Sequence, residues 1–191
     1  ATIVLESFSA TVPIQVNTTG DLIAGKAIAS ILINNESSYS ITIYGDKSEI
    51  ENITSVPVTI NVDGLGAEGT KSYPVKITKP AGVRNMSTDN ITITATFGEE
   101  KQKTIDISKN ISSKNLADGL TVNTVGNQEI TVQAKGVQSV IDSIDTSSIN
   151  AYVDLSGLGV GDHEVEIRID NNNPLISYVV STKLKIKITE G

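Results

Sequence analysis

The feature that most constrains this chain is an internal duplication, in which residues 40–78 reappear in altered form at residues 128–170. Self-similarity at a fixed period decides the architecture before any single segment is interpreted. A shift of 91 residues places identical residues on one another without a gap: Gly45 on Gly136, Ile50 on Ile141, Ile53 on Ile144, Val62 on Val153 and Asp63 on Asp154. After the glycine-rich turn the offset becomes 92, and alternating apolar positions coincide. The chain is therefore predicted to be a tandem array of two modules.

The repeat sets the predicted domain limits. Residues 11–100 form the first module and residues 101–191 the second, while residues 1–10 form a lead-in or the tail strand of a preceding repeat, with a strand at Thr2–Glu6. Between the modules, Gly98–Lys103 is expected to be a linker that allows modest reorientation but is too short for a flexible tether. An elongated arrangement of the two modules is expected.

Composition narrows the classes of function. The 191 residues are 38% hydrophobic and 19% charged, with a net charge of -7, which is a globular profile. The 15 Lys and Arg residues are dispersed, so nucleic acid and anionic lipid headgroups are disfavoured partners. Without cysteine, neither a disulfide framework nor a thiolate zinc site is possible. No long apolar run or signal peptide is recognised, and Ala1 is not an initiator methionine, which indicates an excised segment or a processed product.

Apolar residues at every second position predict strands through most of both modules. Between two of these runs the spacing changes to three and four, which predicts one short helix in each module, near Ile50 and near Ile141. The fold class is therefore all-β, with one short helix per repeat. The alternating strand positions are Val12–Val16; Ala27, Ala29, Ile31, Ile33; Ile41, Ile43; Val58, Ile60, Val62; Tyr73, Val75, Ile77; Ile91, Ile93, Ala95, Phe97; Ile149, Ala151, Val153, Leu155; Val165, Ile167, Ile169; and Leu184, Ile186, Ile188.

A glycine motif tests whether the chain binds a nucleotide. The sequence GLGAEG at Gly64–Gly69 has the G-x-G-x-x-G spacing of dinucleotide sites, and Asp89 follows twenty residues later. Such a site requires a helix that begins at the third glycine and binds the pyrophosphate at its N-terminus. Here an alternating segment follows, and Pro74 and Pro80 would break a helix. The motif is predicted to be a turn between strands.

Two aspartates at equivalent repeat positions, Asp63 and Asp154, could suggest a catalytic pair. A general acid and a general base must converge on one substrate, whereas these residues lie one in each module. Each is predicted to accept hydrogen bonds from free amides in the turn that follows its strand.

Two acidic loops could in principle bind calcium, at Asp162-His163-Glu164 and at Asp170–Pro174. Neither has the ligand spacing, turn glycine and distal glutamate of a calcium loop, so polar turns are expected. His163 is the only histidine, which excludes a site with two imidazoles, and we expect it at the surface of a hairpin. No Ser, His, Asp set is apparent. We predict no catalytic residue, no cofactor and no metal.

Six Asn-x-Ser/Thr triplets are present, and they indicate glycosylation only in a glycosylating secretory pathway. The seven aromatic residues form no interleaved platform for stacking bases or sugars. The triplets begin at Asn17, Asn35, Asn52, Asn85, Asn90 and Asn110.

These elements together resemble the YbbR-like domain. Each copy has an apolar strand that ends in glycine, reading ITIYG or VQAKG, then a short helix with Ile-x-x-Ile, then Val-Asp, a glycine turn and an alternating strand. The first copy adds KPAGV at Lys79–Val83, and the most specific stretch is AYVDLSGLGVGDHEVEI in the second. The resemblance covers nearly the whole chain. It implies a bacterial β-repeat of about 85 residues, similar in fold to a ribosomal protein domain and without known catalytic residues.

The resemblance also implies a role. YbbR-like repeats stand behind a single N-terminal membrane helix on the extracytoplasmic side, in proteins that regulate the membrane diadenylate cyclase and so the synthesis of cyclic di-AMP. The expected partners are this cyclase, reached through the membrane segment or the repeats, and a ligand at the cell surface. No binding residue can be assigned. The alternative function is a structural stalk or adhesin-like module of a bacterial surface protein, for which acidic β-repeats are equally suited.

Overall fold

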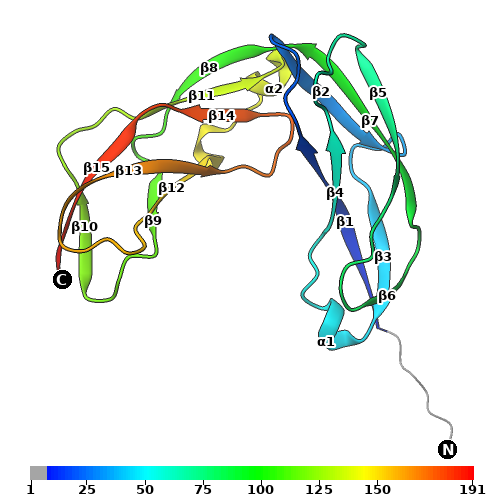
Figure 1. Cartoon of the computed structure of the whole chain (residues 1–191), viewed down its shortest axis with the longest axis horizontal. Helices are drawn as coiled ribbons and strands as arrows, with labels where there is room; N and C mark the ends of the chain where they lie inside the picture. Colours follow the sequence, from blue (N-terminus) through cyan, green and yellow to red (C-terminus); the bar gives the residue numbers. More distant parts are fainter. Residues whose placement is uncertain (1–7) are drawn as a thin grey trace, which may run out of the picture. The chain divides into compact units, whose positions relative to one another are not determined.

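The computed structural model describes residues 8–191, which form two compact units that divide between Gly98 and Glu99. Each unit consists mainly of β-strands and contains one short α-helix (Figure 1). The predicted all-β class with two modules is confirmed. The strand expected at Thr2–Glu6 lies outside the described residues.

The first unit contains two sheets. Four strands are arranged in the order β4-β1-β3-β6, and three in the order β2-β7-β5. The elements are β1 (Phe8–Thr19), β2 (Lys26–Ile33), β3 (Ser40–Gly45), α1 (Lys47–Ile50), β4 (Val56–Asn61), β5 (Thr70–Lys76), β6 (Val83–Met86) and β7 (Asn90–Glu99).

Strand β1 is longer than the predicted Val12–Val16 because it has two partners in succession. Its first half, Phe8–Pro13, pairs antiparallel with β3, and its second half, Ile14–Thr19, pairs parallel with β4. Both pairings depend on residues distant in the sequence, so local alternation identified only the central part of the strand.

The second unit repeats this plan with different sheet boundaries. Five strands have the order β10-β15-β13-β12-β9, and three have the order β14-β11-β8. The elements are β8 (Lys101–Asp106), β9 (Ile111–Lys114), β10 (Leu120–Thr124), β11 (Thr131–Gly136), α2 (Gln138–Asp142), a 3₁₀ turn (Thr146–Ser148), β12 (Asn150–Asp154), β13 (Gly161–Asp170), β14 (Ser177–Val180) and β15 (Lys183–Glu190).

The segment predicted as a linker, Gly98–Lys103, is instead almost entirely strand. Strand β7 ends at Glu99 and β8 begins at Lys101, which leaves Glu100 between them. The two units do divide within this segment, but its strand structure was not predicted, because β8 forms by pairing antiparallel with β11, where Lys103 lies opposite Ala134. Strand β8 and β9 together correspond to the single strand β1: β8 pairs antiparallel with β11, and β9 pairs parallel with β12.

The predicted short helices are confirmed, and each begins directly after a strand that ends in glycine. Ile50 in α1 and Ile141 in α2 are 0% and 2% exposed, so each helix contributes one fully buried aliphatic side chain. Helices of four and five residues are too short to be stable alone, and this burial holds them in place.

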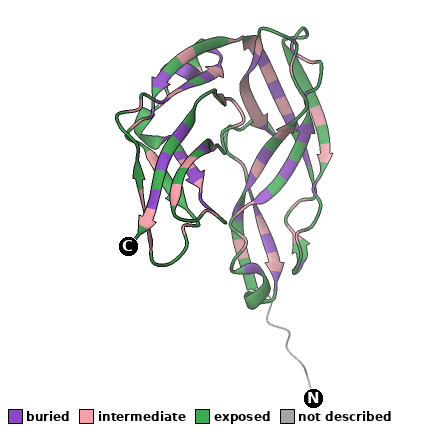
Figure 2. Ribbon diagram, turned by 60° about the vertical axis from the view of Figure 1, so that its left-hand side comes forward, coloured by how far each residue is buried: buried purple, intermediate pink, exposed green. Residues whose placement is uncertain are grey.

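Aliphatic side chains from both sheets fill the interior of each unit, and buried and exposed residues alternate along the strands (Figure 2). Among the described residues, no polar or charged residue is buried. Each buried Val, Leu or Ile contributes about 1.5–3 kcal/mol. In β2 the predicted alternation is incomplete, because the neighbours Ala27 and Ile28 are both buried and Ala29 and Ile31 are only half-buried.

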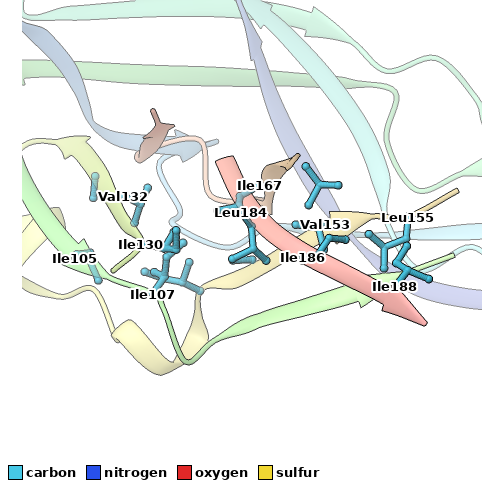
Figure 3. Packing of buried hydrophobic residues seen from close by; sticks show 14 residues of the cluster. Ile105, Ile107, Ile130, Val132, Val153, Leu155, Ile167, Leu184, Ile186 and Ile188 are labelled. Carbon is cyan, nitrogen blue, oxygen red and sulfur yellow. The ribbon is translucent and has the colours of Figure 1, made fainter. Parts of the chain in front are cut away.

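In the second unit the buried cluster draws on both sheets. Figure 3 shows the aliphatic side chains directed toward one another between the strands. The cluster consists of Ile105, Ile107, Ile130, Val132, Ala134, Ile149, Ala151, Val153, Leu155, Val165, Ile167, Leu184, Ile186 and Ile188.

Candidate functional site

The glycine motif Gly64–Gly69 is a turn between β4 and β5, as predicted. Strand β5 begins at Thr70, directly after the third glycine, where a dinucleotide site would require a helix. The turn also contains its own anion, because the backbone N–H of Gly66 donates to Oε2 of Glu68 over 3.1 Å. Backbone hydrogen bonds lower the pKa of Glu68, so its carboxylate is ionised at neutral pH. A negative charge that occupies the turn amides opposes phosphate binding.

Asp63 and Asp154 occupy the predicted turn positions, each in its own unit. The backbone N–H of Asp21 donates to Oδ1 of Asp63 over 3.2 Å. Oδ1 of Asp154 accepts from the side-chain amide of Asn115 over 2.9 Å and from the backbone N–H of Ser156 over 3.1 Å. These bonds, that from Asn115 first, lower the pKa of Asp154. The predicted bond to the following turn is confirmed for Asp154, through Ser156. For Asp63 the predicted donor was wrong, because the amide that bonds it belongs to Asp21, which follows β1. Neither Asp21 nor Asn115 was predicted as a partner.

The polar turn predicted at Asp162-His163-Glu164 is wrong, because these residues lie in β13 and pair with β15. The segment after Asp170 is a polar loop, as predicted. Both segments make local hydrogen bonds. Nε2 of His163 lies 2.8 Å from the carbonyl oxygen of Gly159, at the start of β13. In the other loop, Oδ1 of Asn171 accepts from the backbone N–H of Asn173 over 3.0 Å, and Nδ2 of Asn171 donates to the carbonyl oxygen of Ile176 over 2.6 Å. Within residues 8–191, no group of three or more His, Asp or Glu side chains is placed to hold a metal ion.

All six asparagines of the Asn-x-Ser/Thr triplets are exposed. Their accessibility permits modification but gives no evidence for it, since nearly all polar side chains on a β-rich surface are exposed.

The outer face of the five-stranded sheet carries rows of charged side chains on neighbouring strands. Along β13, every second residue is exposed and charged, and β15 supplies lysines opposite three of these positions. Lys185 Nζ lies 3.5 Å from Glu164 Oε1, and Lys183 Nζ lies 3.9 Å from Glu166 Oε1. Exposed pairs of this kind contribute little to stability, about 0–1 kcal/mol each. Because charges of both signs alternate across the strands, this face presents no anion-binding patch.

Lys114 lies on β9, the edge strand of this sheet on the side away from β15. Its Nζ lies 2.8 Å from Oδ2 of Asp170 and 3.6 Å from the centroid of the Tyr152 ring. The hydrogen bond to Asp170 raises the pKa of Lys114, so the ammonium stays charged at neutral pH and cannot act as a base or nucleophile. The arrangement joins three adjacent strands and is best explained as a structural contact.

An apolar groove of about 360 Å³, so named for its mainly aliphatic lining residues, lies between β13 and β14. These two strands belong to different sheets of the second unit (Figure 1). The Tyr178 ring is half-buried there, and burial raises the pKa of its phenol. Sequence analysis did not identify this feature; the only signal is the apolar run Tyr-Val-Val at residues 178–180. The groove is lined by Ile167, Ile169, Asn171, Ile176, Ser177, Tyr178 and Val180.

No helix among the described residues is long and apolar enough to cross a membrane. The features described so far are hydrogen-bonded turns, a surface with charges of both signs and an apolar groove. None of these features, among the described residues, combines a nucleophile, a base and a stabilising donor. Sequence comparison assigns the family on stronger grounds.

The family profile described as YbbR-like protein matches the chain twice, over residues 12–95 and 105–189. The chain belongs to the YbbR-like family. The two matches correspond to the two repeats found in the sequence, so the resemblance noted from its motifs is confirmed.

The chain is also similar to individual proteins. The CdaA regulatory protein CdaR of Bacillus subtilis is 26% identical over 192 residues, an alignment that covers 98% of this chain and 38% of that protein. A YbbR-like protein from Streptococcus pneumoniae is 16% identical with a TM-score of 0.37, over 100% of this chain and 98% of that one. The YbbR-like domain of a Listeria monocytogenes protein is 16% identical with a TM-score of 0.40, over 47% of this chain and 94% of that one.

Proposed function

We propose that this chain is the non-catalytic extracytoplasmic part of a membrane-tethered regulator of a diadenylate cyclase, and that it modulates cyclic di-AMP synthesis through protein or ligand binding. The observation that carries the proposal is the alignment of nearly the whole chain with a relative named as a regulatory protein of CdaA. The YbbR-like family resemblance suggests the cyclase as the enzyme that is regulated. The chain spans 38% of that relative. A membrane tether for this chain and its position on the extracytoplasmic side are therefore parts of the proposal.

The surface chemistry supports binding and not catalysis. The turn carboxylates and the strand cations have partners within their own units, and Asp63 and Asp154 lie in separate units. A regulator of this kind would act by presenting surfaces to the cyclase or to a cell-surface ligand, with its state transmitted by a membrane segment.

The test is made in a bacterium that carries the parent protein. Residues 11–191 are deleted, cyclic di-AMP is measured by mass spectrometry, and immunoblotting confirms that the truncated protein still reaches the membrane. We expect a changed level of cyclic di-AMP and co-purification of the intact protein with the cyclase. An unchanged level, with no co-purification, would contradict the proposal.

A replacement control separates regulation from the alternative role as a stalk. Residues 11–191 are exchanged for two unrelated β-sandwich domains of similar size. A stalk needs only length and rigidity, so the replacement would restore normal behaviour if the chain were a spacer. Under the proposal, the replacement behaves like the deletion.

A further inference from the structure

Strand β14 is an edge strand, and the direction of its free backbone groups can be derived. The backbone N–H of Ile107 donates to the carbonyl oxygen of Ile130, so Ile130 faces β8. Backbone groups of successive residues in a strand point to opposite sides. Gln133 of β11 therefore faces β14, where it lies opposite Val179. It follows that Ser177 and Val179 bond to β11, whereas the N–H and C=O groups of Tyr178 and Val180 point away from it.

The side chains of Tyr178 and Val180 also line the apolar groove between β13 and β14. The same short strand thus presents unpaired backbone groups along its edge and apolar side chains beside that edge. Among the described residues the Tyr178 hydroxyl has no hydrogen-bond partner, unlike Tyr73, whose hydroxyl donates to the carbonyl oxygen of Asn61 over 2.9 Å. The groove therefore offers the Tyr178 hydroxyl as a donor beside a mainly aliphatic lining.

The corresponding edge of the first unit is different. Ile43 and Ala134 are equivalent in the repeat, and they lie opposite Met86 and Tyr178, so β6 and β14 occupy equivalent edge positions. The edge of β6 is polar, and Lys79 Nζ donates to the carbonyl oxygen of Arg84 over 2.9 Å. A lysine at an edge is a common protection against unwanted strand pairing. The fold therefore does not require an apolar, unprotected edge strand at this position. Of the two equivalent strands, β6 and β14, only β14 has such an edge.

The uncharged lining of the groove indicates which kind of partner can bind there. All residues that line the groove are uncharged, in a chain with a net charge of -7, so a charged ligand would gain no ion pair there. A second copy of β14 could pair only through its backbone and would leave the groove unfilled, because its Tyr178 and Val180 side chains already line its own groove. A foreign strand has alternate side chains free to enter it.

We propose that the edge of β14 and the adjacent groove bind an extended, uncharged segment of a partner protein as an added β-strand. Its backbone pairs with Tyr178 and Val180, and alternate apolar side chains enter the groove. The Tyr178 hydroxyl donates to an acceptor on the same segment. This inference is independent of which enzyme the protein regulates.

The test uses the 191-residue chain and a capped peptide, Thr-Val-Thr-Val-Thr-Val, with N-methyl groups on the three threonines. These methyl groups block one edge and so prevent peptide aggregation, while the valine N–H groups and side chains remain free. Binding is followed by amide chemical shifts in NMR titration. We expect saturable shifts centred on Tyr178 and Val180, and none with a peptide methylated at all six nitrogens.

Two variants complete the test. Val180→Pro removes an N–H on the free edge, where proline is compatible with the existing ladder, and should weaken binding at least tenfold. Val179→Thr is the matched control: its side chain is 48% exposed on the opposite face of the strand, so binding should be unchanged.

Four results would overturn the proposal: no shifts at millimolar peptide, shifts centred elsewhere, equal binding of the fully methylated peptide, or a dimer of the chain that Val180→Pro abolishes. The two peptides on the unsubstituted chain decide the question even if Val180→Pro fails to fold.

Discussion

The side-chain amide of Gln128 hydrogen-bonds both backbone groups of Lys185. Nε2 of Gln128 donates to the carbonyl oxygen of Lys185 over 2.7 Å, and the backbone N–H of Lys185 donates to Oε1 of Gln128 over 2.8 Å. A primary amide has the same donor and acceptor as a peptide group, so it continues the pairing of β15 beyond Thr124, the last residue of β10. The backbone N–H of Val125 also donates to the Lys185 carbonyl oxygen, over 3.0 Å.

In the first unit, Asn34 makes the equivalent contact with the backbone of Thr92 on β7, through different atoms. The backbone N–H of Asn34 donates to the carbonyl oxygen of Thr92 over 2.8 Å, and Oδ1 of Asn34 accepts from the backbone N–H of Thr92 over 2.9 Å. The backbone donor of Asn34 matches that of Val125 in the second unit, but the Asn34 side chain supplies only an acceptor, whereas Gln128 supplies both a donor and an acceptor. This difference leads to opposite predictions for two similar substitutions.

Gln128→Glu should destabilise the second unit by about 1–2 kcal/mol, because the carboxylate has no donor and is placed against the two carbonyl oxygens, of Lys185 and Val125, that now accept from Gln128 Nε2. Urea unfolding followed by circular dichroism measures the loss, and faster hydrogen exchange of the Lys185 amide localises it. The matched control is Gln133→Glu, an exposed glutamine on β11, which should change the unfolding free energy by less than about 0.5 kcal/mol. Equal effects of the two substitutions would refute this role for Gln128.

Alanine at the two glycines that precede the helices should be more costly in the first unit. A β-carbon at Gly45 would lie 2.6 Å from the carbonyl oxygen of Gly82 and 2.9 Å from Cγ2 of Ile50, whereas at Gly136 its nearest neighbour would be the Leu175 carbonyl oxygen at 3.0 Å. Overpacking of this kind costs about 1–3 kcal/mol. We expect Gly45→Ala near the upper end and Gly136→Ala near the lower end, measured by thermal unfolding. A larger effect at Gly136 would show that the backbone near Gly82 yields easily.

Sequence alone was sufficient where structure depends on local periodicity, and insufficient where it depends on distant partners. The burial of Ile50 and Ile141 followed from the repeat and the change in spacing. The strand at Lys101–Asp106 did not, because its polar residues become a strand only by pairing with β11. For the same reason neither the amide contacts of Gln128 nor the groove beside Tyr178 could be predicted, since the first joins residues 57 positions apart and the second forms between strands of different sheets.

The stability of the second unit should depend on the ionisation of Asp154. Its folded-state pKa is lowered, chiefly by the hydrogen bond from Asn115, so the ionised carboxylate stabilises the fold above its ordinary pKa of about 4. That contribution is lost as the pH falls through the lower, folded-state pKa. Asp154→Asn keeps the acceptor oxygen but cannot titrate, so unfolding free energy should vary less with pH below about 4. Urea unfolding from pH 2 to 6 tests this, with the exposed Asp118→Asn as control. Identical pH profiles for the Asp154→Asn variant and the parent chain would exclude the assigned role.

Asn34→Asp should be nearly neutral, in contrast to Gln128→Glu. The aspartate retains the oxygen that accepts from Thr92, and the donor in this contact is the backbone N–H, which the substitution leaves in place. Asn34 has a φ of 51°, a left-handed conformation that Asp tolerates better than most residues. Asn34→Ala loses the acceptor and adds strain, so it should cost about 1–2 kcal/mol. Urea unfolding of both variants, with hydrogen exchange at the Thr92 amide, makes the comparison. If Asn34→Asp destabilised the chain as strongly as Asn34→Ala, the side-chain amino group of Asn34 would have to make a contact that this arrangement does not contain.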